Sequence, residues 1–133
     1  MKCIKLDIDE RRIDWKRIRT VIQFFKLKIN LDMSWIAKTK KGFHIYLFIS
    51  NSDELKVTDE DLCFIQCAMG DDYKRSCLNW KRVTIGHDWQ KKNWNVLFNM
   101  KIHSDLKGHS KIASMEKPLG NIQLKRRLGN VKL

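Results

Sequence analysis

The 133-residue chain contains little of what marks several large protein classes. It has one proline, Pro118, and six glycines, with no Gly/Ser-rich tract and no internal repeat, so the sequence indicates neither long linkers nor a repeat architecture. No stretch approaches the roughly 18 to 20 apolar residues that cross a membrane. The first residues enter a strand pattern directly, without the apolar core of a signal peptide. We therefore expect an intracellular, cytoplasmic protein with no membrane partner.

The four cysteines do not form a metal-binding pattern. No two of them are spaced as CxxC, and Cys63 and Cys67, four residues apart on a predicted helix, have no histidine near them in the sequence. Since intracellular cysteines are mostly reduced, we expect free thiols. A buried apolar role is the favoured interpretation for this pair.

Acidic residues are scarce relative to basic ones. Lys and Arg number 27 and Asp and Glu number 15, which gives a formal net charge of +12. Such an excess favours a polyanionic partner, with nucleic acid as the first expectation and an anionic membrane surface as the second. The alternative is that the positive charge only keeps the protein soluble.

Apolar periodicity predicts an α+β fold in a single domain. Strands are expected at 1–8, 33–39, 43–49, 75–85 and 94–102, and helices at 13–27 and 58–69. Thr58 is expected to cap the second helix, and Gly42 to supply a positive φ in the Lys40-Lys41-Gly42 hairpin turn. The order predicts a ferredoxin-like or RRM-like βαββαβ sheet with two helices on one face and an additional C-terminal strand. The domain would cover 1–105, and 106–133 would form a basic, partly irregular tail.

The alternation of the predicted strands places several polar residues on the open face of this sheet. Ile4, Leu6, Ile45 and Leu47 would pack under the helices. In a ferredoxin-like sheet the first and third strands are central and the fourth lies beside the first. The opposite face would then gather Asp7, Asp9, His44, Asn79 and Lys81.

Asp7 and Asp9 stand two apart on one strand, so both side chains point to the same side. Paired carboxylates of this kind can hold Mg²⁺ or Mn²⁺, whose other ligands are usually water and phosphate. Such ions stabilise charge in phosphoryl transfer. Two structural interpretations remain open, in which Asp9 caps the first helix and Asp7 pairs with a lysine on the neighbouring strand.

These residues resemble the palm of the archaeo-eukaryotic primase and primase-polymerase superfamily over roughly residues 1–103. Its first motif, two hydrophobic residues followed by Asp, a hydrophobic residue and Asp or Glu, is similar to KLDID at 5–9, with Lys5 at a hydrophobic place. Its second motif, a Gly-containing turn with a His entering a strand, is similar to TKKGFHIYL at 39–47. Its third motif, a hydrophobic residue followed by Asp, corresponds to Leu78-Asn79, where Asn replaces the acid.

The resemblance implies a metal-dependent nucleotidyltransferase of nucleic-acid replication. Asp7, Asp9 and His44 would be its catalytic residues, and Mg²⁺ or Mn²⁺ would be held by Asp7 and Asp9, with Asn79 as a weak third ligand. The phosphates of a nucleoside triphosphate would contact Thr39, Lys40, Lys41, His44 and Lys81. Because Asn is a neutral ligand, the chain is either such an enzyme or a descendant that binds single-stranded nucleic acid or a primer-template without catalysis.

A non-catalytic RRM-like module for single-stranded nucleic acid is the alternative. Residues 41–48 partly fit the signature of its third strand, which would turn Phe43 outward where the primase palm needs His44 outward. Aromatic residues interleaved with lysines suit stacking on single strands, and a half-buried loop is an equal interpretation of this segment. The predicted nucleic-acid contacts are Trp89, Lys91, Lys92, Trp94, Arg126 and Arg127.

Overall fold

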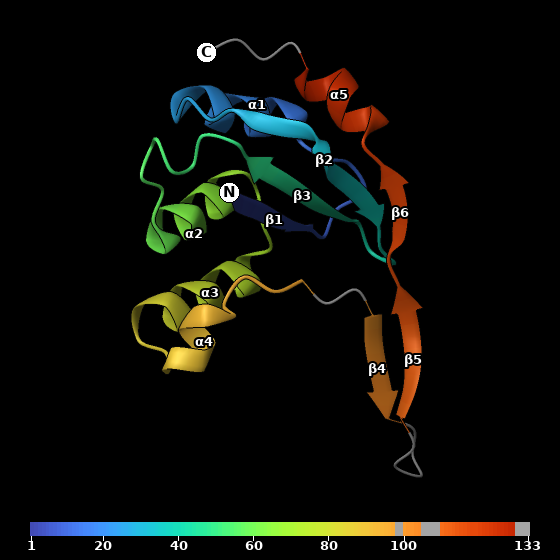
Figure 1. The fold of residues 1–133 in the computed structure, drawn as a ribbon. Helices are drawn as coiled ribbons and strands as arrows, with labels where there is room; N and C mark the ends of the chain where they lie inside the picture. The colour runs from blue at the N-terminus through green and yellow to red at the C-terminus, as the bar shows by residue number, and fades with distance from the viewer. Residues whose placement is uncertain (98–99, 105–109, 130–133) are drawn as a thin grey trace.

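The computed structural model describes residues 1–97, 100–104 and 110–129, and for 100–104 and 110–115 only the backbone (Figure 1). Its elements are β1 (Lys2–Ile8), α1 (Trp15–Phe24), β2 (Ile29–Lys38), β3 (Phe43–Ile49), α2 (Asp59–Ala68), α3 (Tyr73–Thr84), α4 (Asp88–Lys92), β4 (Met100–Ser104), β5 (Ser110–Met115), β6 (Lys117–Gly120) and α5 (Ile122–Leu128). In the described part, an antiparallel four-stranded sheet has the order β1-β3-β2-β6, and β4 pairs with β5 separately. None of the described helices is long and apolar enough to cross a membrane.

The α+β class is confirmed, and so are the predicted elements up to Gly70. The Asp14 side chain accepts a hydrogen bond from the Arg17 amide at the start of α1, which is the expected N-cap geometry. At α2, Thr58 and Asp61 form a reciprocal capping box. Gly70 follows with φ +100°, a left-handed conformation that glycine adopts without a Cβ clash.

One hydrophobic core holds the sheet and the helices together. Ile4 and Leu6 of β1 and Ile45 and Leu47 of β3 are fully buried on the same face of the sheet, as the alternation predicts. They belong to one cluster with apolar side chains of α1 and α2, and Leu124 of α5 joins the same cluster. The opposite face of β1 and β3 therefore carries Asp7 and His44.

The strand predicted at 75–85 is wrong, because this segment forms helix α3. Asp72 caps the helix by accepting from the Arg75 amide, and basic residues in the last turn suit the negative end of the helix dipole. As a result the burial expected for a strand is reversed. Asn79 is buried, whereas Leu78 and Trp80 are exposed.

Side chains, rather than a fourth strand, form hydrogen bonds with the backbone groups along the outer edge of β1. Gln66 Oε1 accepts from the Lys5 amide at 2.9 Å, and Asp71 Oδ1 accepts from the Asp7 amide at 2.8 Å. The Lys5 carbonyl accepts from the Arg75 guanidinium at 2.9 Å. Since buried backbone groups need partners, these contacts replace the ladder that the predicted fourth strand would have formed. β1 is consequently an edge strand, not a central one.

The C-terminal region also differs from the prediction. The expected strand at 94–102 is replaced by an irregular segment up to residue 97 and by β4, while residues 98–99 lie outside the described part. In the region predicted as a basic, partly irregular tail, the described residues include β5, β6 and α5. β6 pairs with β2 and so extends the main sheet, and Leu128 of α5 is buried. Residues 117–129 thus belong to the folded body of the protein.

Candidate functional site

Asp7 and His44 lie opposite each other on β1 and β3, on the face of the sheet away from the core. The distance between Asp7 Oδ1 and His44 Nε2 is 3.6 Å. The Asp7 side chain is 36% exposed and the His44 side chain only 6%. The predicted strand phase is therefore confirmed, although His44 is covered where an exposed side chain was expected.

Glu116, a residue that the sequence analysis did not single out, covers His44. Its Oε2 atom is 2.7 Å from His44 Nδ1, and it accepts a hydrogen bond from the Tyr46 hydroxyl at 3.1 Å. Ala37 pairs with His44 on one side and with Pro118 of β6 on the other, which brings the segment just before β6 near His44. The result is a row of carboxylate, imidazole and carboxylate on the open face of the sheet.

Burial makes the carboxylate of Asp7 harder to ionise. Loss of water raises the pKa of Asp7 above its ordinary value, and attraction to His44 offsets this only in part. Asp72 and Asp9 raise the Asp7 pKa further because their like charges repel the carboxylate. A bound cation would offset both effects, so the site is chemically suited to a metal ion or another positive group.

The Lys40-Lys41 turn lies against the end of β1, next to this site. The Thr39 hydroxyl accepts from the Gly42 amide at 3.0 Å, which closes the turn and leaves Lys40 and Lys41 exposed. The prediction that Gly42 supplies a positive φ is wrong. Among the described glycines, only Gly70 and Gly120 have a positive φ. Its role is close approach, since a Cβ on Gly42 would stand 1.8 Å from the carbonyl oxygen of Ile8.

The predicted metal-ligand set of Asp7, Asp9 and Asn79 is not assembled. Asp9 is exposed beyond the end of β1, and Asn79 lies on α3 with both polar atoms of its amide buried and unpaired. In the part of the chain that the structure describes, no three His, Cys, Asp or Glu side chains form a metal-binding group. The residues present fit a divalent ion with few protein ligands, since Asp7 supplies an oxygen and His44 Nε2 lies beside it.

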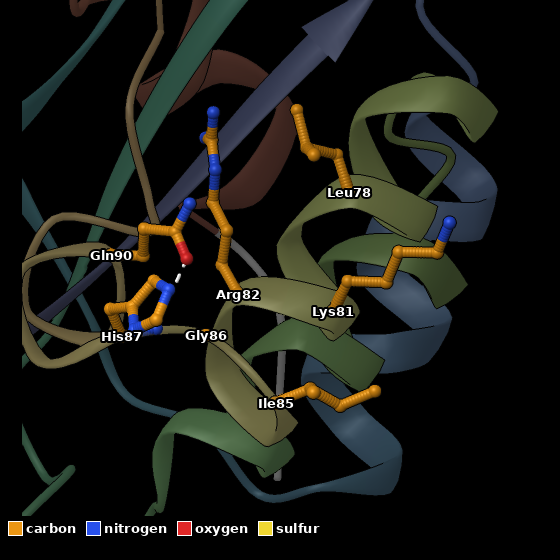
Figure 2. Close-up of a pocket in the computed structure, with 7 residues that line it drawn as sticks. All are labelled: Leu78, Lys81, Arg82, Ile85, Gly86, His87 and Gln90. Carbon is orange, nitrogen blue, oxygen red and sulfur yellow. Dashed lines mark hydrogen bonds between the residues drawn. The ribbon is translucent and has the colours of Figure 1, made fainter.

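The other predicted contact residues are spread over the molecule. Lys81 lies on α3, not on the open face, and lines a shallow hollow between α3 and α4 with Leu78, Ile85 and His87 (Figure 2). Trp89 is 65% exposed, whereas Trp94 is 4% exposed and belongs to the core, which corrects its assignment as a stacking residue. The basic contacts predicted on α4 and α5 are all exposed: Lys91, Lys92, Arg126 and Arg127.

Aromatic side chains continue the open face beyond His44. Trp35 and Tyr46 are stacked with ring centroids 4.2 Å apart, and Phe48 lies 6.3 Å from Trp35. Phe43 packs against the core, so β3 has the phase that the primase palm needs and not the phase of the RRM signature. The aromatic row nevertheless provides half-exposed rings of the kind on which bases stack.

Comparisons with protein-family models, with curated proteins and with solved structures find no match for this chain.

Proposed function

We propose that the protein binds nucleic acid at the Asp7 end of its sheet, as a minimal primase-polymerase-like palm that handles phosphate there with Mg²⁺ or Mn²⁺. The observation that carries this proposal is the pairing of Asp7 with His44 beside the exposed Lys40-Lys41 turn. The net charge of +12 supports a polyanionic partner. In this proposal β1, α1, β2, β3 and α2 form the first part of a ferredoxin-like unit.

Each part of the site has a simple chemical task. Lys40 and Lys41 would contact phosphates as point charges, which positions the strand without reading its bases. Asp7 would hold the divalent ion, and exposed Asp9, whose charge acts on Asp7, would bind one of its waters. The ion supplies charge stabilisation at a transferring phosphoryl group. Without the ion, the carboxylate of Asp7 would repel the same phosphates.

The salt dependence of oligonucleotide binding tests the phosphate contacts. Fluorescence anisotropy with a labelled single strand should give a slope of log K against log salt near −3.5 for about five contacts. The double variant Lys40→Ala/Lys41→Ala should flatten the slope by about 1.4, or roughly 0.7 per lost contact. The control variant Lys16→Ala/Lys28→Ala loses the same charge from two exposed residues outside the turn and should keep the wild-type slope. Absence of binding at low salt would refute the proposal.

Asp7→Asn separates the role of the metal from that of the lysines. In EDTA this variant should bind the oligonucleotide more tightly than the wild type, because a negative charge beside the phosphates is removed. When Mn²⁺ is added, the wild type should gain affinity and the variant should not. Equal responses of the two proteins to Mn²⁺ would show that Asp7 holds no ion.

An RRM-like module remains the second candidate, favoured by the Trp35–Tyr46 stack on the open face. Base stacking contributes roughly 1 to 3 kcal/mol per base and carries no charge. In that case Trp35→Leu would weaken binding by at least about fivefold while leaving the salt slope unchanged. The lysine variant of the turn would then have little effect.

A further inference from the structure

The hydrogen bond between His44 and Glu116 fixes which nitrogen of the imidazole carries hydrogen. A carboxylate only accepts, so at 2.7 Å from Glu116 Oε2 the hydrogen lies on His44 Nδ1. In a neutral imidazole the other nitrogen, Nε2, then presents a lone pair. Tyr46 also donates to Glu116, which holds the carboxylate in this position.

In the neutral form of His44, the lone pair of Nε2 faces the Asp7 carboxylate. Asp7 Oδ1 is 3.6 Å away, which is longer than a hydrogen bond, and no described residue forms a hydrogen bond with Nε2. With a neutral imidazole both atoms are electron-pair donors, and two donors that face each other at this distance repel phosphate and attract a cation. The family resemblance assigns His44 to phosphate binding, whereas this geometry favours a metal ion.

We propose that His44 Nε2 and the Asp7 carboxylate form a nitrogen–oxygen site for a first-row transition-metal ion, in preference to Mg²⁺, and that Glu116 is its positioning residue. Imidazole is a good ligand for Zn²⁺ and its neighbours, while Mg²⁺ prefers oxygen ligands only. A carboxylate that orients a metal-binding histidine through the opposite ring nitrogen is a recurring arrangement. Water and, on the function proposed above, phosphate oxygens would complete the coordination.

The tautomer of His44 can be measured without any metal. Long-range ¹H–¹⁵N spectra of the untagged protein at pH 7.5 should show His44 with Nδ1 protonated and Nε2 unprotonated. In Glu116→Gln this preference should weaken, while His87, the residue before α4, should be unchanged and serves as an internal control. A spectrum with hydrogen on Nε2, alone or together with Nδ1, would overturn the inference, because Nε2 would then be a donor.

Titration with Zn²⁺ tests the site itself. The Nε2 resonance of His44 should shift and saturate with Zn²⁺, and an equal concentration of Mg²⁺ should leave it in place. Glu116→Gln should weaken Zn²⁺ binding at His44 by about 10- to 100-fold, the usual effect of losing an orienting carboxylate. The control variant His87→Gln should not change it. Zn²⁺ that binds elsewhere without moving the His44 resonance, or Mg²⁺ that shifts it equally, would refute the proposal.

Oligonucleotide binding in EDTA keeps the two proposals apart. If the oligonucleotide binds in EDTA and the His44 resonance does not shift with Zn²⁺, only the metal inference fails. If Zn²⁺ binds at His44 and no oligonucleotide binds at low salt, the metal site stands and the proposed function fails.

Discussion

Arg75 bonds the outer edge of β1 and also pairs with a buried carboxylate. Its guanidinium is 2.7 Å from Asp71, whose carboxylate is fully buried, and it also donates to the carbonyl of Lys5. Arg75→Met would keep most of the side-chain length and leave the Asp71 carboxylate buried without a cation. Removing one partner of a buried ion pair typically costs about 3 to 5 kcal/mol. A loss of that size is a large part of the roughly 5 to 15 kcal/mol that stabilises a domain.

Urea unfolding of four proteins measures this effect. We expect Arg75→Met to lose about 3 to 5 kcal/mol, and the double variant Asp71→Asn/Arg75→Met to recover part of that loss, because no buried charge is then left unpaired. Lys74→Met, at an exposed position of the same helix, should stay within about 0.5 kcal/mol of the wild type. A cost below about 1 kcal/mol, or a double variant no more stable than Arg75→Met, would refute the reasoning.

The same variant should show a distinct pH dependence. Burial already raises the pKa of Asp71, with Arg75 opposing the shift, so loss of Arg75 should raise that pKa further. A carboxyl whose pKa is higher in the folded state favours folding at low pH, and this contribution is lost as the pH rises through the folded-state pKa. The stability difference between Arg75→Met and the wild type should therefore be smaller near pH 4 than at pH 7.

Two further substitutions test the packing around the site. Gly42→Ala should destabilise the protein by about 1 to 3 kcal/mol, because the added Cβ would meet the backbone of Ile8. Gly120→Ala has open space around the added Cβ and should show only the cost of its positive φ. Equal effects of the two variants in urea unfolding would show that close approach is not the role of Gly42. Asn79→Asp should destabilise the protein by several kcal/mol instead of creating a metal ligand, because it buries an unpaired charge. Asn79→Leu removes an unpaired buried amide and should be neutral or stabilising. Enhanced Mn²⁺ binding by a stable Asn79→Asp protein would support the assignment of Asn79 as the third metal ligand.

The sequence predicts the fold well wherever local signals agree. Up to Gly70 the strand alternation, the Asp14 and Thr58 caps and the helix-ending glycine all indicate the same structure, and the strand phase correctly brings Asp7 and His44 together. These signals depend on residues close in sequence, so they can be recognised without the tertiary structure.

The prediction fails at a helix whose local capping signals it missed and at a contact between residues far apart in the sequence. The segment 75–85 alternates briefly like a strand, but Asp72 caps it as a helix and Asp71 pairs with Arg75 one turn away. Glu116 contacts His44 although the two residues are 72 apart in the sequence. It is placed there because β6, which follows it directly, pairs with β2. No local sequence pattern indicates such a contact, so the role of Glu116 in orienting His44 could not be predicted.

Mapping the oligonucleotide on the protein by amide NMR tests the proposed function most directly. With a short single strand and Mn²⁺ replaced by diamagnetic Zn²⁺, we expect the largest shifts at Thr39–His44 and at the end of β1, from Asp7 to Asp9. Smaller shifts on α4 and α5 would mark additional phosphate contacts. Saturable binding whose shifts avoid the Lys40-Lys41 turn and the Asp7–His44 pair would contradict the proposal that this end of the sheet handles nucleic-acid phosphate.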